Sequence, residues 1–425
     1  MIELNESIGQ AVGERTYLRP IATGTPPNPV YMHPDSKGLQ FWFQILANAG
    51  IEVIITEDGE RFDDKPRRDL DFRYESWGEL ATRVALGNSA LDREHGDDYM
   101  PLMYQISEGH VLLGGRHLQH GDHTQPHRTQ SVFTNCATAA SAWARFYLLL
   151  NGSGVGRSLS DDLLLVDWDN APHVQCVMSE SHRDFRWGGE FMSSQEARIR
   201  FGAGDRVHWH DVEDSREGWA KALETWEMMA FEKRYKDDLL ILDFSAVRPA
   251  GAPIRGMQGR PSSGPCPTMA AFHKAAAGRG SGLPRWKATA YIEHYFSESV
   301  MVGGARRAAG LLEKQWKDPG ILDFIRSKVP AEYLGLSAEE IVEHRKKFGP
   351  PASTPLWTAN HSVGVDAEFW WLLTLKRGGA GYSSATARHA RKVFRTVVET
   401  AYATGTGEPG FLNLHKLNVS SRGLK

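Results

Sequence analysis

The chain has 425 residues, of which 41% are hydrophobic and 24% are charged, the balance of a folded globular protein. Its formal net charge of −3 gives no attraction to nucleic acid, which usually requires a basic face. The sequence contains neither the ~20 consecutive apolar residues of a membrane span nor the basic and apolar start of a signal peptide. The three cysteines (Cys136, Cys176 and Cys266) are too few for a disulfide scaffold. We therefore expect a cytoplasmic protein that binds neither nucleic acid nor membrane.

Residues 1–74 are predicted to form an N-terminal arm with a small α/β segment, because Pro and Gly are frequent up to residue 38. The stretch 74–92 then has apolar residues at helical spacing, with Ser76 as the expected N-cap. We assign residues 75–425 to one large second unit.

The middle of the chain alternates between strand-like and helix-like segments. SVFTNC (131–136) predicts a short strand, and ATAASAWARFYLLL (137–150) predicts a helix. The apolar run LLILDFSAV (239–247) fits a parallel strand that is covered on both faces. Residues 157–210 are predicted to be an irregular insertion and a candidate effector region. Alternating strands and helices indicate an α/β fold with parallel strands.

Several helices are predicted in the second half of the chain. The first has Asp214 or Ser215 as its cap. Their ranges are 214–235, 269–280, 305–316, 337–348 and 385–405.

Cys136 is the first candidate for chemistry, because a strand cysteine near a Gly-rich turn can present a thiol to a substrate. Free cysteine is, however, often only a small buried apolar residue. The turn GSGVG (152–156) also suggests a dinucleotide site, but that motif should follow a strand and open a helix. Here a predicted helix precedes it, so we favour a tight turn whose bare backbone meets substrate.

Two further segments offer anion sites. Residues 248–265 are rich in Gly and Pro and must form a loop, and SSGP (262–265) precedes a predicted helix, where backbone N–H groups suit phosphate. VGGARRAAGLL (302–312) carries an arginine pair, Arg306 and Arg307, which could hold phosphate or carboxylate. The alternatives are an ordered connection and a solvated arginine pair.

A histidine cluster is the one metal-like feature. No cysteine or carboxylate at a suitable spacing completes it, so we expect no metal site. Its members are His110, His117, His120, His123 and His127.

Four motifs in one order resemble the catalytic subunit of ribonucleotide reductases, nearest to the adenosylcobalamin-dependent (class II) branch that reduces triphosphates. They are TNC (134–136), NGSGVG (151–156), DFSAVRPAGAPIRGMQGRPSSGP (243–265) and GEPGFLNL (407–414). The resemblance spans roughly residues 75–420 and is sparse between 157 and 210.

This resemblance implies the N-terminal part of the family's ten-stranded α/β barrel. It implies that Cys136 is one half of the dithiol that reduces the substrate and is itself oxidised to a disulfide. The implied substrate contacts are Asn135, Gly154, Gly156, Ser262, Ser263 and Gly264. The implied effector contacts are Arg248, Arg255, Arg306 and Arg307.

The resemblance also implies parts that these 425 residues lack, above all the finger loop whose cysteine becomes a thiyl radical. We expect an incomplete barrel whose thiyl cysteine comes from a separate polypeptide. The expected cofactor is adenosylcobalamin, with a metal radical from a ferritin-like subunit as the alternative. The expected partners are a ribonucleotide, a deoxynucleoside triphosphate effector and a thioredoxin-like reductant. There are two competing hypotheses. The chain is either an inactive nucleotide-binding relative with a regulatory role or an unrelated α/β oxidoreductase that uses the 152–156 turn.

Overall fold

The computed structural model describes most of the chain from residue 134 onward and shorter stretches before it. The described ranges are 136–202, 204–254, 260–302, 306–307, 309–349 and 354–414, with 18, 20–22, 29–34, 46, 51–59, 61, 72–91, 99–111, 113, 118 and 134.

One sheet has five parallel strands in the order β17-β16-β15-β6-β5. Helix α6 connects the neighbours β5 and β6, whereas a long excursion separates β6 from β15. The strands are β5 (Cys136–Thr138), β6 (Gly154–Ser158), β15 (Ala309–Gln315), β16 (Ala359–Val365) and β17 (Gly410–Asn413). The helices are α6 (Ala142–Leu150), α11 (Ile321–Arg326), α12 (Ala338–Phe348), α13 (Ala367–Thr374) and α14 (Ala385–Thr404).

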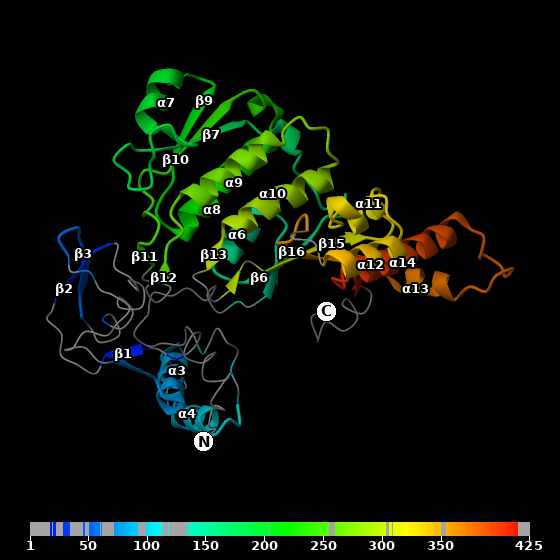
Figure 1. Cartoon of the computed structure of the whole chain (residues 1–425), viewed down its shortest axis with the longest axis horizontal. Coiled ribbons are helices and arrows are strands. Elements are labelled where there is room, and N and C mark those ends of the chain that lie inside the picture. The colour runs from blue at the N-terminus through cyan, green and yellow to red at the C-terminus, as the bar shows by residue number, and fades with distance from the viewer. Residues whose placement is uncertain are drawn as a thin grey trace.

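The α/β class with parallel strands is confirmed, but a ten-stranded barrel is not. The strands that the structure describes form open sheets and no closed barrel. Figure 1 shows helices α11 to α14 gathered at the C-terminal end of the fold, beside β15 and β16.

A second sheet lies within the long excursion between β6 and β15. Its four parallel strands have the order β8-β7-β10-β9, and four of the five residues of β10 are buried, as its apolar run predicts. The strands are β7 (His173–Met178), β8 (Met192–Ser193), β9 (Val207–Asp211) and β10 (Leu239–Asp243). The helices are α7 (Ser194–Phe201), α8 (Arg216–Ala230), α9 (Cys266–Ala277) and α10 (Arg285–Ser299). The range 157–210, which the sequence suggests to be irregular, thus contains three strands and a helix.

Short hairpins follow this sheet, and single 3-10 turns occur between the larger elements. The hairpins pair β11 (Pro253–Ile254) with β12 (Arg260–Pro261) and β13 (Met301–Val302) with β14 (Arg306–Arg307). The 3-10 turns are η3 (Trp168–Asn170), η4 (Lys233–Tyr235) and η6 (Ala331–Tyr333).

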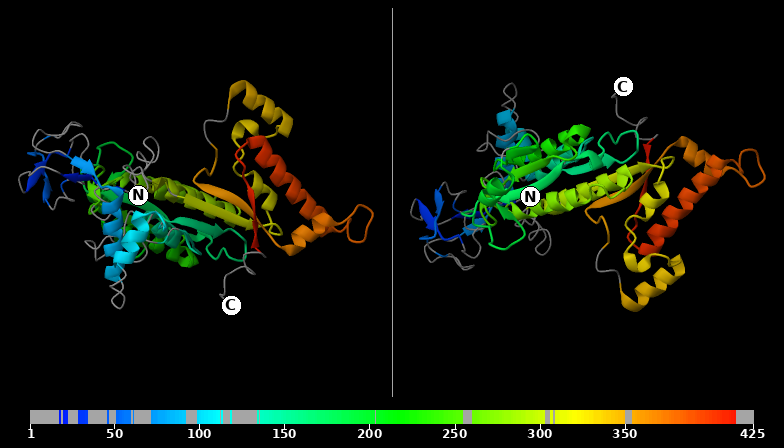
Figure 2. Two further views of the ribbon diagram at one scale, coloured as in Figure 1. Left: turned by 90° about the horizontal axis from the view of Figure 1, so that it is seen from below. Right: turned by 90° about the horizontal axis from the view of Figure 1, so that it is seen from above.

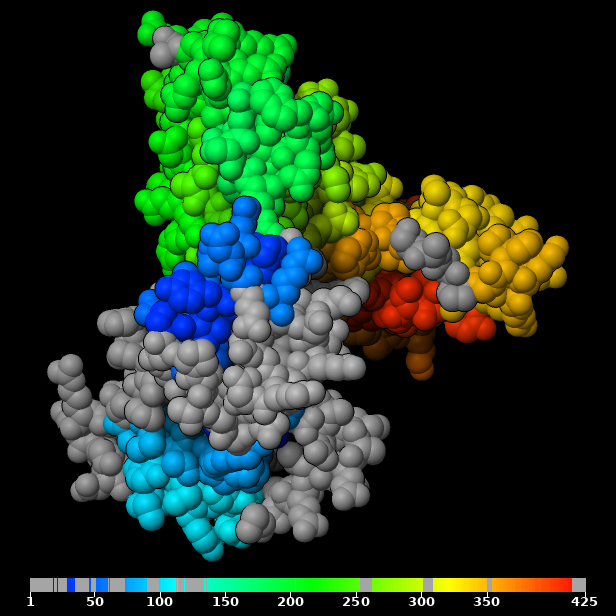
Figure 3. All heavy atoms as spheres, turned by 60° about the vertical axis from the view of Figure 1, so that its left-hand side comes forward, coloured from blue at the N-terminus to red at the C-terminus, as the bar shows by residue number. Residues whose placement is uncertain are grey.

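Helix α10 belongs to both parts of the fold. Its residues Ile292 and Phe296 are buried in the apolar core that contains α6, α8 and α9, and Trp286 and Ala290 are buried in the core beneath β15 and β16. Figure 1 shows α10 between α9 and the α11 region, and Figure 3 shows the green and the yellow-to-red residues as separate lobes of the surface.

Glu293, in the middle of α10, lies between two buried arginines. Its carboxylate oxygens lie 3.3 Å from Nε of Arg145 on α6 and 2.8 Å from Nη1 of Arg157 on β6. Arg145 also donates a hydrogen bond to Ser297 Oγ at 2.7 Å. Burial lowers the pKa of Arg145, and the Glu293 charge opposes this shift. The triad therefore fixes α6, β6 and α10 together.

The N-terminal stretches form small separate elements. Helices α3 (Trp77–Leu91) and α4 (Tyr99–Ser107) share an apolar cluster. The strand pairs are β1 (Pro20–Ala22) with β4 (Phe72–Tyr74) and β2 (Val30–Met32) with β3 (Val53–Ile55). Figure 2 shows these blue and cyan elements at one end of the molecule, away from the orange α14.

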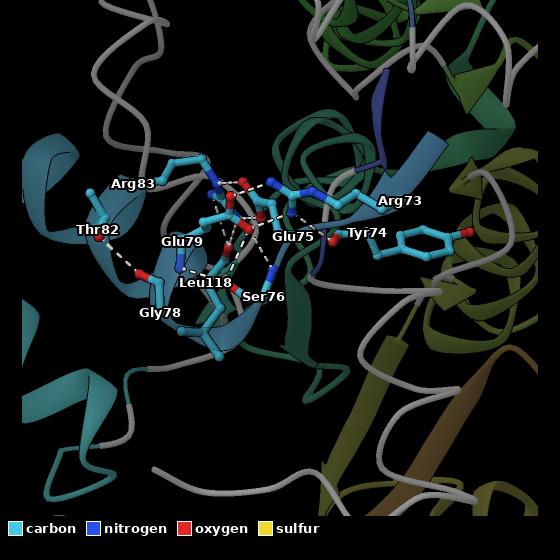
Figure 4. Close-up of polar contacts among 9 residues, drawn as sticks. All are labelled: Arg73, Tyr74, Glu75, Ser76, Gly78, Glu79, Thr82, Arg83 and Leu118. Atoms are coloured by element: carbon cyan, nitrogen blue, oxygen red, sulfur yellow. Dashed lines mark hydrogen bonds and ion pairs between the residues drawn. The ribbon is translucent and has the colours of Figure 1, made fainter. Parts of the chain in front are cut away.

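Ser76 caps helix α3, as the sequence predicts. Glu79 N–H donates to Ser76 Oγ at 3.3 Å, and Ser76 N–H donates to Glu79 Oε2 at 2.8 Å, which completes a capping box (Figure 4). The hydrogen bond from Arg73, followed by that from the Ser76 backbone, lowers the pKa of Glu79 to about 2. Arg83 and Glu75 form a buried pair next to this cap, with Nε and Oε1 2.8 Å apart.

Most predicted helices are confirmed, and one is wrong. The helices expected at 214–235, 269–280, 337–348 and 385–405 correspond to α8, α9, α12 and α14, and Ser215 caps α8. The helix expected at 305–316 is instead β14 and β15. Its Ala, Leu, Glu, Lys and Gln favour helix intrinsically, but pairing between β6 and β16 overrides that preference. Among the described residues, no helix is both long and apolar enough for a membrane span.

We predict that Glu293→Gln lowers the free energy of unfolding by about 3–5 kcal/mol, because it leaves two buried guanidinium groups with one neutral partner. Chemical denaturation followed by circular dichroism measures the change. The matched control is Glu224→Gln on α8, which removes an i,i+3 pair between the exposed Lys221 and the partly exposed Glu224 and should cost less than about 1 kcal/mol. Equal costs for the two variants would contradict the role given to Glu293.

Candidate functional site

The two faces of the five-stranded sheet differ in chemistry. On one face, Val155, Leu312 and Val363 are buried against the helices. On the other face the strand register places Cys136 beside Gly154 and Thr138 beside Gly156. Cys136 and Thr138 are exposed there, at the edge strand of the sheet. The second face is therefore open where the candidate cysteine lies, and we call it the open face.

Cys136 is the first residue of β5, and helix α6 begins six residues later. The sequence predicts a strand that ends at Cys136 and a helix from 137; the structure instead has a strand at 136–138 and N-caps α6 with Ser141. The shift follows from backbone pairing, since Ala139 N–H donates to Gly156 O at 3.0 Å and continues the ladder beyond Thr138.

Buried Glu227 anchors the start of α6 just after Cys136. Its two carboxylate oxygens accept from Ala142 N–H at 3.0 Å and from Trp143 N–H at 2.9 Å. Burial raises the pKa of Glu227, and these two backbone hydrogen bonds oppose the shift. Because Glu227 already satisfies these N–H groups, the N-terminus of α6 is not available to a phosphate.

The Gly-rich segment is a turn followed by a strand. Gly152 adopts φ 74°, and Ser153 Oγ donates to Thr134 O at 2.6 Å, which ties the turn to the chain just before Cys136. Gly154 and Gly156 then lie within β6. A helix precedes the motif and a strand follows it, the reverse of a dinucleotide-binding turn. The tight turn predicted at 152–156 is therefore confirmed only at its start, since Gly154 and Gly156 lie in the strand, and the exclusion of a dinucleotide-binding motif holds.

Packing does not require a glycine at position 156. An added Cβ would contact Thr138 Cγ2 at 3.8 Å, and Ala137 O and Leu311 Cδ2 at 3.9 Å each, which are ordinary distances. Gly310 on the next strand differs, because a Cβ there would overlap Arg145 Nη2 and lie 3.0 Å from the Ala359 Cβ. The bare backbone at Gly156 thus leaves room above the open face.

Ser262, Ser263 and Gly264 lie in the part of the fold with the four-stranded sheet and precede α9, as expected. Gly264 has φ 68°, donates its N–H to Ser262 Oγ at 3.0 Å, and packs so closely against Asp184 that a Cβ would overlap the carboxylate. Asp184 in turn accepts from Ala250 N–H at 2.8 Å. Folding alone therefore explains the glycine here, and these contacts are separate from those that bring Cys136, Gly154 and Gly156 together.

The four arginines predicted to contact an effector are described by the structure to different extents. Arg248 pairs with Asp214, at 2.8 Å from Nε to Oδ2. Arg306 and Arg307 lie in strand β14 and not at the start of a helix, and only their backbone is described. The remaining candidates lie outside the described residues: Arg255, Asn135, His117, His120, His123 and His127. Within the described part of the chain, no group of three or more His, Cys, Asp or Glu side chains could hold a metal ion.

Sequence reasoning missed Glu313, a buried carboxyl on the open face. The register places it beside Ser158, and its Oε1 has no hydrogen-bond partner among the described atoms. Burial raises the pKa of Glu313, and a hydrogen bond from Ser158 opposes the shift. Gly364 makes room for the carboxyl, because a Cβ there would overlap Oε1. The sequence signal for Glu313 was an acidic residue within the apolar segment AGLLEKQ (309–315). It was overlooked because this segment was predicted to be a helix, where an acidic residue is common.

The chain is similar in sequence and in structure to known proteins. Residues 177–276, which hold most of the four-stranded sheet, match the family model of the B12-dependent ribonucleotide reductase insertion domain. A protein of Mycobacterium phage D29, named as an adenosylcobalamin-dependent ribonucleoside-triphosphate reductase, is 26% identical over 82% of this chain and 49% of its own length. The Lactobacillus leichmannii enzyme of the same name is 25% identical over 70% of this chain and 43% of its own.

A solved structure shares the fold. The crystal structure of a B12-dependent (class II) ribonucleotide reductase superposes with a TM-score of 0.50 at 22% identity, covering 71% of this chain and 44% of the other. The chain thus spans about half the length of the curated relatives it matches.

We predict that Gly156→Ala leaves the free energy of unfolding unchanged or raises it by up to about 1 kcal/mol, because the new methyl group fits and the unfolded chain loses freedom. If the open face binds a ligand over β6, the same change should weaken that binding at least several-fold. Denaturation and calorimetry measure the two effects. Gly310→Ala is the control and should destabilise the fold; a destabilised Gly156→Ala would show that packing requires the glycine.

Proposed function

Since the chain is a class II ribonucleotide reductase-like protein, we propose that it is the part of such an enzyme that carries one reducing cysteine, and that the enzyme converts ribonucleoside triphosphates to deoxyribonucleotides. The observation that supports this most directly is the exposed Cys136, paired in register with Gly154 on the open face of a parallel sheet. The relatives' names supply the substrate class.

In the proposed reaction, two thiols deliver two electrons and two protons, the 2′ oxygen leaves as water, and the thiols become a disulfide. Cys136 supplies one thiol. Cys176 is buried in β7, and Cys266 is the first residue of α9. Burial raises the pKa of each of these thiols, so neither resembles the exposed Cys136. We therefore place the second thiol and the thiyl cysteine in residues beyond these 425, with a thioredoxin-like protein as the reductant.

The five-stranded sheet is proposed to be one half of the ten-stranded barrel, with its open face turned inward. The residues on that face support the proposal. A sheet face exposed only to solvent would have no reason to carry the buried carboxyl of Glu313 or the glycines of β6. Gly154 and Gly156 would then lie against the ribose. We keep Ser262, Ser263 and Gly264 as proposed phosphate contacts, and Arg306 and Arg307 as proposed contacts of a deoxynucleoside triphosphate effector.

Adenosylcobalamin is the proposed cofactor, because the curated relatives are named for it. When bound, it supplies the radical that starts the reaction. Two hollows in the described part of the chain have volumes of about 310 and 150 Å3. Neither of these two hollows is large enough for a corrin.

The separate polypeptide expected from the sequence stays a prediction. It can be tested by assaying this chain alone and together with a polypeptide that carries the remaining half of the relatives' length. Deoxynucleotide formation by the chain alone would contradict it. Nucleotide binding without turnover in either case would favour the inactive relative.

We predict that Cys136→Ser abolishes multiple-turnover reduction in the complete enzyme, because one serine oxygen cannot form the disulfide. Nucleotide affinity should stay within about twofold. The assay is deoxynucleotide formation with a thioredoxin system and adenosylcobalamin, together with calorimetry for binding. Cys266→Ser and Cys176→Ala are the controls and should keep turning over. Full activity of Cys136→Ser would remove the thiol from the mechanism.

A further inference from the structure

A small hollow lies on the helix-covered side of the five-stranded sheet, where β16 and β17 begin. Its volume is about 150 Å3. This is room for more than one water, which needs ~10–15 Å3 on this kind of measure, but less than the ~300–1,000 Å3 of a site for drug-sized ligands. Its lining combines apolar and polar side chains, among them Ile325, Lys328, Trp357, His361, Thr400 and Glu408.

His361 is the decisive residue of this hollow. It is 2% exposed and stacks on Phe324, with ring centroids 4.8 Å apart. Its Nε2 has no hydrogen-bond partner among the described atoms. A buried polar atom without a partner costs about 1–3 kcal/mol, so a water or a ligand that donates a hydrogen bond to Nε2 would be stabilising.

The neighbours of His361 determine which of its ring nitrogens carries the proton. Ser327 Oγ lies 3.3 Å from Nδ1 and already donates its own hydrogen to Phe324 O at 2.8 Å. Ser327 can therefore only accept from Nδ1–H, which leaves Nε2 as a lone-pair acceptor. Burial, followed by the charge of Lys328, lowers the pKa of His361 to about 3, so the ring is neutral at physiological pH.

The other polar groups restrict the charge of the ligand. Lys328 and Glu408 form an ion pair at the hollow and neutralise one another. Because these two charges cancel, the hollow has no net charge that would select an anion or a cation. A hydroxyl group can both donate to Nε2 and accept from a threonine or a lysine. Ile325, Pro409 and Trp357 offer apolar surface for a carbon skeleton.

We propose that this hollow binds a small neutral molecule with several hydroxyl groups, of the size of a free pentose or a short polyol, held by a hydrogen bond to His361 Nε2. The site is distinct from the open face. His361 points to the helix-covered side of β16, and two strands, β15 and β6, lie between β16 and the β5 strand of Cys136. The proposal therefore stands independently of the reductase chemistry.

The experiment uses the full chain with 15N-labelled histidine imidazoles and D-ribose as the probe. We expect a saturable shift of the His361 Nε2 resonance, with half-saturation on the order of 1–10 mM. Sodium acetate and tetramethylammonium chloride at equal concentration should leave that resonance in place.

Two variants on α14 locate the site. Thr400→Leu fills the hollow without altering His361 and should abolish the ribose shift. The adjacent Glu399→Leu changes an exposed residue and should leave it intact. His361→Phe keeps the ring stack and should remove ribose heat in calorimetry.

Three outcomes would overturn the proposal. The absence of a shift with ribose would mean that the hollow holds water only. Acetate could shift the resonance as ribose is expected to, which would assign an anion site. A ribose shift that survives Thr400→Leu would place the sugar elsewhere.

Discussion

The ion triad of Arg145, Glu293 and Arg157 is the constraint on which the rest of the structure depends. It joins a helix that follows β5, a strand of the five-stranded sheet and a helix that returns from the four-stranded sheet. Burying three charges is costly, and removing one of them is costlier still. The triad therefore fixes how two apolar cores, to both of which α10 contributes, lie against each other.

This arrangement explains why the sheet has one open face. The triad, α6 and α10 all lie on the side of Val155 and Arg157, and they bury the alternate positions of β6. Gly154 and Gly156 point to the opposite face of β6, and no helix of the described residues packs against them there. The position of Cys136 follows, because β5 pairs with β6 and Glu227 fixes the start of α6 directly behind it.

Local signals in the sequence predicted local structure well. The caps Ser76 and Ser215 depend on residues within one turn of each other. The proximity of Cys136 to Gly154 and Gly156 was predictable because these residues are close in the chain as well as in the sheet. Contacts between distant segments were not predictable: Glu227 caps a helix 85 residues before it, and β15 follows β6 only after the whole four-stranded sheet. The strand β15 was mistaken for a helix for this reason.

The glycines of the fold are of two kinds, those that packing requires and one that packing does not explain. At Gly264, Gly310 and Gly364 an added Cβ would overlap a neighbouring side chain, so folding alone requires the residue. At Gly156 the methyl group would find ordinary contacts, and its strand does not need the conformational freedom that glycine provides. A glycine that weakens a strand without improving its packing is expected where another molecule approaches the backbone. That molecule would lie on the open face, next to the thiol of Cys136.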